Sequence, residues 1–243
     1  MTKDNIINLW KLTDRPGINE LITFLIDSDF FTAPCSVKHH LAKPGGLAEH
    51  SLNVYTLLSE KAQRFCIQAP HESVIICALG HDLCKVNFYI EGGEPCSKAQ
   101  YDYLCSLWTH KEPVVSGKPE ALLSLLEDNK FKRSIPAASA TILIDWLKNN
   151  PRDPFPDMPI VYSVKDKTPL GHGEKSVSIL QDFIKLTEVE KLAIRWHMGP
   201  WDISDYSGKW AFNNALTFSP LVALLITADF EAGSIIEKEE VDC

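Results

Sequence analysis

Four residues that can bind a metal interrupt positions where the surrounding sequence is apolar. His50 stands in GGLAEHSLNVY at 45–55, and His81 and Asp82 stand together in CALGHDLCKVN at 77–87. Asp229 directly follows LITA at 225–228. Taken singly, an inward histidine is more often a hydrogen-bonded core residue, and a buried aspartate is usually a cap or an ion-pair partner. Together they would need several separate buried cations, whereas one divalent ion satisfies all four, so we expect them to converge on a metal.

Helical periodicity predicts the elements that must position these residues. A helix over 47–66 carries His50 on the face of Val54 and Leu57. A helix over 72–83 is apolar all round, as a central helix would be, and ends in His81 and Asp82. Thr187 and Glu190 form a capping box at the start of another helix, and Ser219-Pro220 begins a helix that runs to about 233.

A long segment, about 87–165, separates these motifs. VNFYI at 86–90, followed by EGGE, predicts a strand that enters a hairpin, and residues 160–164 form a second strand candidate. Two further helices are predicted over 119–128 and 137–149, before a proline-rich connector at 150–156. The expected fold class is therefore mostly α, a helical bundle with a helical insertion and one small β-hairpin.

Composition excludes several classes of protein. The 243 residues include 45% hydrophobic and 23% charged residues, and no apolar run reaches the length of a membrane span. No signal peptide is recognisable at the N-terminus, and the seven cysteines are scattered without a CxxC pair, so we expect free thiols in a reducing cytoplasm. The net charge of −8 argues against binding extended nucleic acid through phosphate contacts alone. It leaves room for a small anionic substrate, because bound metal ions supply positive charge locally.

The order His50, His81-Asp82, Asp229 resembles the H…HD…D signature of the HD-domain metal-dependent phosphohydrolases. Gly45-Gly46-Leu47 before His50 resembles the PGGLxxH segment in HD domains of bacterial 3′–5′ exoribonucleases, and HDLCK at 81–85 resembles the HDxxK element of the family. The resemblance covers about 40–86 and 168–233. It implies one HD-type domain over 1–243, interrupted by the insertion at about 87–165.

Two further histidines resemble those of family members that hold more than one metal. His172 stands in PLGHGEKSV and His197 in IRWHMGPWD, where both are expected to ligate a second ion bridged by Asp82. Many multi-metal members have a histidine pair in the last interval, whereas here Trp196 precedes His197. Without a second ion, His172 and His197 would be donors to a substrate phosphate. The resemblance implies one or two divalent ions, of Mn, Fe, Zn, Ni, Co or Mg.

The implied activity is hydrolysis of a phosphate ester in a nucleotide or another small phosphorylated substrate, by a metal-activated water. Asp82 would ligate the metal and orient the water, and His172 or His197 would protonate the leaving oxygen. Lys85 and Lys175 could hold a phosphate, although solvated lysines are commoner.

Two further residues are predicted near the substrate. His40 would contact phosphate or form a surface pair with His39, and Trp201 would stack a base or belong to the core. No membrane partner is expected, and the sequence does not indicate an oligomeric state.

Two other functions remain open. The PGGLxxH resemblance suggests a 3′–5′ exoribonuclease or phosphodiesterase, but such members usually carry a separate nucleic-acid-binding module, and none is recognisable in the first 40 residues. A non-catalytic HD regulatory or binding module is the third reading. The intact set of ligands argues against it.

Overall fold

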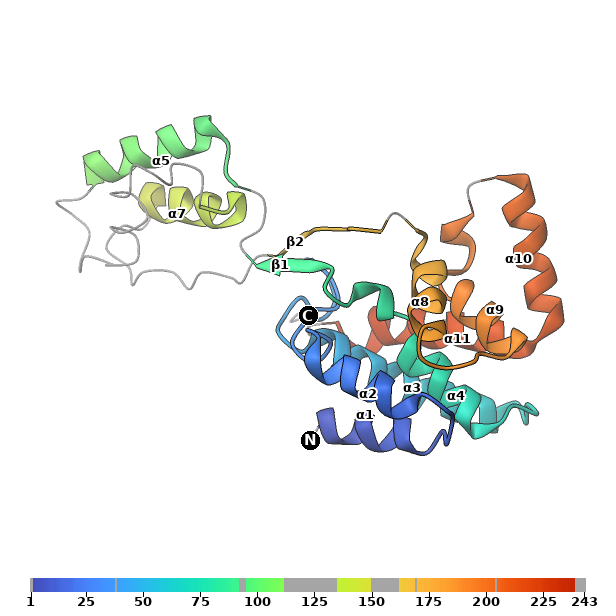
Figure 1. Cartoon of the computed structure of the whole chain (residues 1–243). Coiled ribbons are helices and arrows are strands. Elements are labelled where there is room, and N and C mark those ends of the chain that lie inside the picture. Colours follow the sequence, from blue (N-terminus) through green and yellow to red (C-terminus); the bar gives the residue numbers. More distant parts are fainter. Residues whose placement is uncertain are drawn as a thin grey trace. The chain divides into compact units, whose positions relative to one another are not determined.

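The computed structural model of this chain consists mainly of helices with one two-stranded sheet, which confirms the predicted fold class (Figure 1). The structure describes residues 2–37, 39–91, 95–111, 135–149, 162–168, 170–203 and 205–238. The chain forms two compact units. We call Met1–Tyr89 with Asp166–Cys243 the helical unit, and Ile90–Lys165 the inserted unit. The inserted unit lies within the segment predicted as an insertion at 87–165, whereas residues 87–89 belong to the helical unit.

The described helices of the helical unit are arranged around one hydrophobic core. In chain order they are α1 (Thr2–Lys11), α2 (Ile18–Asp27), α3 (Gly46–Arg64), α4 (His71–Gly80), the 3-10 turn η1 (Leu83–Lys85), α8 (His172–Gln181), α9 (Glu188–Arg195), the 3-10 turn η4 (Gly199–Asp202), α10 (Tyr206–Phe218), α11 (Pro220–Glu231) and the π turn η5 (Ala232–Ile236).

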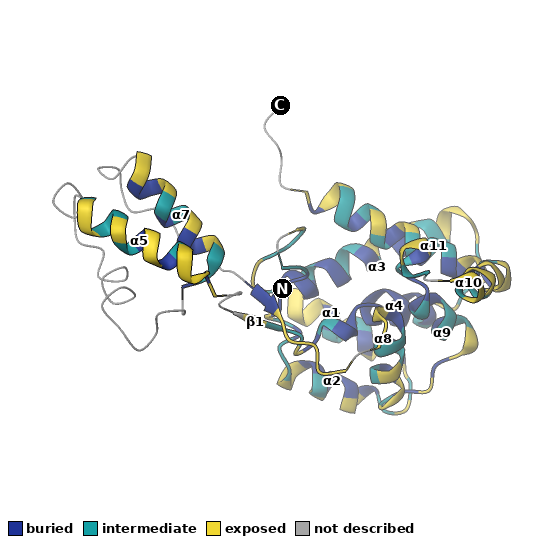
Figure 2. Ribbon diagram, turned by 90° about the horizontal axis from the view of Figure 1, so that it is seen from above, coloured by how far each residue is buried: buried dark blue, intermediate teal, exposed yellow. Residues whose placement is uncertain are grey.

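The α4 helix lies at the centre of this core. It is buried from Ser73 to Gly80, as its uniformly apolar sequence predicts (Figure 2). α3 packs against α4 and α11, while α9 packs against α4, α8 and α11. The helices that carry His50 and Asp229 therefore meet around the end of α4, where His81 and Asp82 follow.

A buried ion-pair network joins the N-terminal helices to this core. The guanidinium of Arg15, in the loop before α2, donates to both carboxylate oxygens of Glu190 at 2.7 Å and to Glu72 at 2.9 Å. The hydroxyl of Ser73 also donates to Glu190, at 2.6 Å. Glu190 completes the predicted capping box with Thr187, so one carboxylate links the start of α9 to α4 and to the α1–α2 loop.

The α4 helix ends three residues earlier than the predicted end at 83. A β-carbon on Gly80 would lie 2.7 Å from a methyl carbon of Leu180 in α8, so the helix ends where α8 packs closely on it. The chain then turns through His81 and Asp82 into η1, and the backbone N–H of Cys84 donates to the hydroxyl of Ser176 at 3.0 Å. His81 and Asp82 therefore lie in a turn rather than on a helix.

The α11 helix begins as predicted, with the Ser219 side chain accepting from the N–H of Leu221 and proline in the first turn. Its predicted end at about 233 lies two residues beyond the end of the α-helix. The α-helix ends at Glu231 and the chain continues as a π turn through Ile236, which brings Glu237 beside α3. π turns inserted in or after α-helices are frequent at functional sites.

The inserted unit has a small core of its own. The predicted strand over 86–90 is mostly wrong, because β1 covers only Tyr89–Glu91 and pairs with β2 (Tyr162–Val164). Asn87 has a left-handed φ of 53° and donates its N–H to Asp29, so the chain turns there. The helix predicted over 137–149 is confirmed as α7 (Ala137–Asn149), which packs on α5 (Lys98–Lys111), a helix that was not predicted. The helix predicted over 119–128, the connector at 150–156 and residues 160–161 lie outside the described residues.

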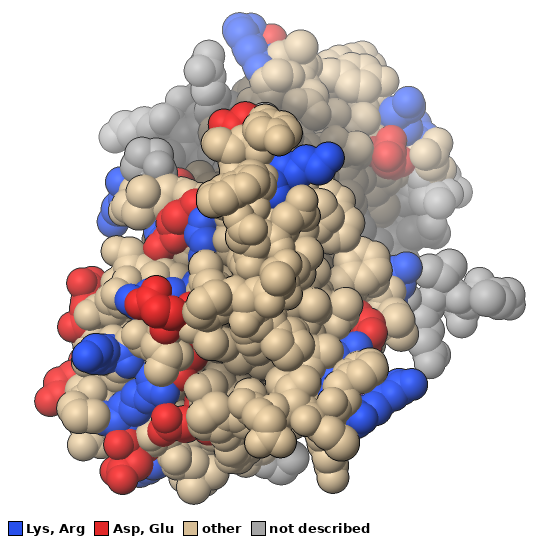
Figure 3. Space-filling model, turned by 90° about the vertical axis from the view of Figure 1, so that its right-hand side faces the viewer, with Lys and Arg blue, Asp and Glu red and all other residues tan. Residues whose placement is uncertain are grey.

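The α10 helix leaves large apolar side chains exposed, namely Tyr206, Trp210 and Phe218. Figure 3 views the α10 side of the molecule, where few charged side chains lie across the middle of the face. Within the described part of the chain, no helix alone combines the length and hydropathy that a membrane crossing needs. α10 with the helical segment 220–236 meets that test only as a pair bent by 106°.

Candidate metal centre

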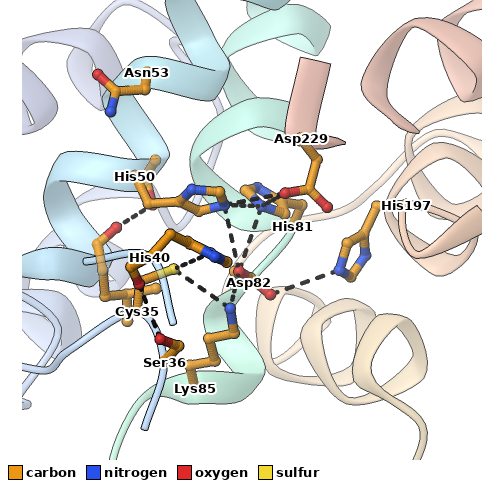
Figure 4. Close-up of polar contacts among 12 residues, drawn as sticks. Cys35, Ser36, His40, His50, Asn53, His81, Asp82, Lys85, His197 and Asp229 are labelled. Atoms are coloured by element: carbon orange, nitrogen blue, oxygen red, sulfur yellow. Dashed lines mark hydrogen bonds and ion pairs between the residues drawn. The ribbon is translucent and has the colours of Figure 1, made fainter. Parts of the chain in front are cut away.

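The ring nitrogens of His50 and His81 face each other inside the helical unit, with two carboxylates beside them (Figure 4). The Nε2 atom of His50 lies 3.2 Å from Nε2 of His81, 3.6 Å from Oδ2 of Asp82 and 3.2 Å from Oδ1 of Asp229. The Nε2 atom of His81 lies 3.5 Å from Oδ2 of Asp82 and 3.9 Å from Oδ1 of Asp229. The structure therefore brings together the four residues that the sequence singles out.

These separations are those expected around one ion. Ligand atoms bound about 2.0–2.2 Å from a tetrahedral ion lie about 3.3–3.6 Å from one another. The ligand atoms of His50, His81 and Asp82 all lie within 4.8 Å of each other, and Asp229 borders this group through His50. A single divalent ion can contact this group without a large movement of the backbone.

The hydrogen bonds made by the Nδ1 atoms fix which ring nitrogen carries the proton. The Nδ1 atoms of His81 and His197 each lie against the backbone carbonyl three residues earlier, at 2.8 and 2.7 Å. The Nδ1 atom of His50 lies 2.9 and 3.0 Å from the two carboxylate oxygens of Glu237. Because carbonyl and carboxylate oxygens only accept, each Nδ1 donates, and Nε2 of the neutral ring presents a lone pair. This is the usual arrangement of metal-binding histidines.

The charge of the cluster favours a cation. Burial opposes ionisation of Asp82 and Asp229, yet Lys85 and His81 hold the pKa of Asp82 well below its usual value, and His50 and His81 do the same for Asp229. Burial lowers the pKa of His81 to about 4. The site thus combines two ionised carboxylates with a neutral His81. Although burial opposes it, Cys35, Asp229 and Glu237 raise the pKa of His50 well above its usual value, so a divalent ion would take the place of the His50 proton.

Lys85 already lies against one of these carboxylates. Its Nζ atom is 2.6 Å from Oδ2 of Asp82 and 3.5 Å from the Sγ atom of Cys35. The Nε2 atom of His40 lies 3.4 Å from the same sulfur. Although burial opposes it, Lys85, His50 and His40 lower the pKa of Cys35 to about 7. Lys85 and His40 therefore border the cluster, and Cys35 joins them as a thiol that was not predicted.

On the other side of Asp82 lie the two additional histidines. The Nε2 atom of His197 is 3.6 Å from Oδ1 of Asp82. His172, in the first turn of α8, places Nδ1 3.3 Å from the Sγ atom of Cys84, which is itself 3.8 Å from Oδ1 of Asp82. His172 and His197 thus both lie near Asp82, and Cys84 lies with them.

Glu237 is a functional candidate that the sequence analysis missed. Its side chain is buried, and besides His50 it accepts a hydrogen bond from the amide of Asn53 at 2.9 Å. Burial opposes its charge, but His50 and Asn53 lower its pKa. It orients the His50 ring from the side remote from the cluster, as the carboxylate partners of metal-binding histidines do.

A cavity of about 240 Å³ opens beside Asp82 and Asp229. The predicted substrate residues His40 and Trp201 line it. Trp201 is 70% exposed and stacks on Phe230, with ring centroids 5.6 Å apart and an interplanar angle of 6°. The remaining lining residues are Lys85, His197, Met198, Ile226, Phe230, Gly233 and Ser234.

Lys175 does not line this cavity. Its ammonium pairs with Asp166 at 2.6 Å and lies 5.0 Å from the ring centre of Phe88. The lysine predicted to contact a substrate phosphate therefore has an intramolecular partner instead. His39, the possible surface partner of His40, is exposed.

The donor set fits a divalent metal. The Nε2 atom of His197 is buried and has no hydrogen-bond partner among the described residues, although it faces Asp82. Comparison of the chain with models of known protein families, with curated proteins and with solved structures finds no match in any of the three. The His/Asp clusters that could hold a metal are thus established by geometry alone.

Proposed function

We propose that this protein is a metal-dependent phosphohydrolase of the HD-domain type, which cleaves a phosphate ester in a small substrate. One observation carries the proposal: His50, His81, Asp82 and Asp229 converge beside a cavity, with two imidazole Nε2 atoms and two carboxylates facing one another. Their order along the chain resembles the HD signature.

Each residue of the cluster has a distinct part in the proposed reaction. His50, His81, Asp82 and Asp229 hold a divalent ion, which when bound lowers the pKa of water and neutralises charge on phosphoryl oxygens. Asp82 lines the cavity and accepts a hydrogen bond from the attacking water, which orients it. His197 also lines the cavity. Although burial opposes it, the Asp82 carboxylate raises the pKa of His197, which suits it to give a proton to the leaving oxygen.

Lys85 is placed to attract the phosphate of a substrate. Its ammonium lies at the cavity wall and, although buried, stays charged because of Asp82, which raises its pKa well above the usual value. When a phosphate enters, the ammonium can contact both it and Asp82, because the three donor protons point in different directions.

The size and walls of the cavity support a nucleotide as substrate. A volume of about 240 Å³ is just below the roughly 300–1,000 Å³ of sites for drug-sized ligands. It accommodates the phosphate and part of a substrate, while the remainder reaches the mouth. There the exposed face of Trp201 offers a surface on which a base can stack, an interaction worth about 1–3 kcal/mol.

The test is a hydrolysis screen of the purified protein with Mn(II), Zn(II), Co(II) or Mg(II). Substrates are mononucleotides, nucleoside triphosphates, cyclic dinucleotides, short RNA and glycerol phosphate. We expect metal-dependent release of phosphate from a nucleotide, abolished by Asp82→Asn in a folded protein. Asp27→Asn, at an exposed position on α2, is the matched control and keeps full activity.

Two results would contradict the proposal. Activity that survives Asp82→Asn would place the chemistry elsewhere, and a metal-loaded protein inactive on every substrate would leave a binding module. Trp201→Ala tests the substrate class: it should raise KM for the nucleotide but not for glycerol phosphate, whereas Trp210→Ala, exposed on α10, should change neither. Cleavage of short RNA alone would favour the exoribonuclease alternative.

A further inference from the structure

A second group of metal-binding atoms lies on the opposite side of Asp82 and includes sulfur. Cys84 is the second residue of η1 and is buried. Its backbone N–H donates to Ser176 at 3.0 Å, which fixes the turn against α8. The sulfur is thereby held close to both Asp82 and His172.

The separations in this group suit a tetrahedral ion. Zinc lies about 2.3 Å from cysteine sulfur and about 2.0–2.2 Å from nitrogen or oxygen, so the ligand atoms lie about 3.3–3.8 Å apart. The Sγ atom of Cys84 is 3.3 Å from Nδ1 of His172 and 3.8 Å from Oδ1 of Asp82, and all three atoms lie within 4.8 Å of one another.

The two oxygens of Asp82 serve different neighbours. Oδ2 faces Lys85, His50 and His81, whereas Oδ1 faces Cys84 and His197. Lys85 therefore supplies positive charge on the Oδ2 side.

On the Oδ1 side, the buried Nε2 atom of His197 has no hydrogen-bond partner among the described residues and is directed at Oδ1, 3.6 Å away. Its Nδ1 donates to a backbone carbonyl, so Nε2 is the ring atom that a proton or a metal ion would occupy on this side of the carboxylate. This second, independent feature also calls for a cation there.

The other nearby thiol does not need a metal in the same way. Cys35 already has the Lys85 ammonium at 3.5 Å and His40 at 3.4 Å. Cys84 has a carboxylate, a histidine and the hydroxyl of Ser176 close to it. Of the two thiols, Cys84 is the one whose surroundings favour a bound cation.

We propose that Cys84 supplies a sulfur ligand to the second ion that the family resemblance implies at Asp82 and His172, with His197 beside it, and that this site therefore binds a thiophilic divalent ion such as Zn(II) or Co(II). Binding replaces the thiol proton, which passes to solvent, by a sulfur–metal bond, and no electron is transferred. The role of this ion in phosphate chemistry rests on the proposed function, but its binding does not. A sulfur ligand would also make this site more selective than the His/Asp cluster, because thiolates disfavour Mg(II) and Mn(II).

Cobalt(II) is the probe for this site, because cobalt bound to thiolate has an intense charge-transfer absorption in the near ultraviolet that imidazole and carboxylate ligands do not give. The reduced full-length protein is titrated with Co(II) and bound metal is counted. The variants are Cys84→Ser, Cys35→Ser and, as the matched control at an exposed position, Cys66→Ser. Circular dichroism checks that each variant is folded.

We expect the absorption band in wild type, Cys35→Ser and Cys66→Ser. In Cys84→Ser both the band and one bound ion per chain should be lost. His172→Ala should weaken binding of that ion at least tenfold and leave the fold unchanged. Absence of the band from wild type, its persistence in Cys84→Ser, or its loss only in Cys35→Ser would overturn the proposal. If the band behaves as expected in a protein without phosphohydrolase activity, only the proposed function fails. If activity depends on Asp82 but no band appears, only the Cys84 site fails.

Discussion

Glu237 offers the sharpest test of the first metal site, because it can be altered without touching a ligand atom. The Nδ1 atoms of His81 and His197 donate to backbone carbonyls, which no substitution removes. His50 alone of these three is oriented by a side chain, through two contacts of 2.9 and 3.0 Å to Glu237. Substituting Glu237 therefore perturbs one ligand and leaves the cluster otherwise intact.

The expected loss follows from those contacts. Partners of metal-binding histidines typically contribute about 10–100-fold to affinity, or about 1.4–2.8 kcal/mol. We expect Glu237→Ala to fall near the upper end, because both carboxylate oxygens contact the ring and the Asn53 amide loses its acceptor too. Glu237→Gln keeps an acceptor but no charge, so about tenfold is expected. The assay is competition for Zn(II) against a chromogenic chelator near neutral pH.

The control lies in the same segment. Glu231→Ala removes a partly exposed ion pair with Lys61 and should leave Zn(II) affinity unchanged, at a stability cost of at most about 1 kcal/mol. If Glu237→Ala folds and binds Zn(II) as tightly as wild type, His50 is not a ligand held by this carboxylate. The assignment of the first site would then be wrong.

Two further predictions concern stability. Glu190→Gln should destabilise the protein by about 3 kcal/mol in urea unfolding, because it leaves the guanidinium of Arg15 without its buried partner. Despite burial, Arg15 lowers the pKa of Glu190 below 4.5, so the ionised carboxylate stabilises the fold above that pH, and this stability is lost as the pH falls through the lowered pKa. The plot of unfolding free energy against pH should therefore be flatter on its acid side in the variant, and an unchanged slope would contradict this. Gly173→Ala places a β-carbon 2.1 Å from the backbone oxygen of Arg195, so α8 must move away from α9. We expect the free energy of unfolding, measured by thermal denaturation, to fall by about 1–3 kcal/mol. Gly208→Ala, whose nearest contact is 3.4 Å, is the control and should be neutral or stabilising.

The His/Asp cluster that could hold a metal was predictable because its members break an apolar pattern. His50 and Asp229 lie on helix faces that otherwise pack in the core, and His81 and Asp82 end an apolar helix, so their types and burial could be inferred from spacing. The convergence of these four side chains could also be inferred, because buried charges need a common partner.

Glu237 and the two thiols carried no such signal. Glu237 stands in IIEKEE at 235–240, a charged run typical of a solvated tail, and only the π turn after α11 returns it to His50. Cys84 meets His172 across 88 positions of sequence, which no local spacing motif can encode. Lys175 was assigned to the substrate because nothing local reveals that Asp166 becomes its partner.

The fold was predicted best where helices have strong ends. The capping box of Thr187 and the Ser219-Pro220 start were confirmed, because both depend on local hydrogen bonds. The ends of α4 and of β1 were wrong, since one depends on how closely α8 packs at Gly80 and the other on a left-handed turn at Asn87. Tertiary contacts decide such boundaries.

Because β1 pairs with β2, the chain segments that lead into and out of the inserted unit lie side by side. Paired strands lie about 4.8 Å apart. Tyr89 and Asp166, the helical-unit residues on either side of the inserted unit, are each fixed within the helical unit, Tyr89 through its hydroxyl to the carbonyl of Cys35 at 2.9 Å and Asp166 through Lys175. Closing a flexible loop costs only about 0.6 kcal/mol more for each doubling of its length. An insertion at this point can therefore lengthen, shorten or be exchanged in evolution at little thermodynamic cost, while the two parts of the helical unit that flank it, which carry the cluster that could hold a metal, stay in register.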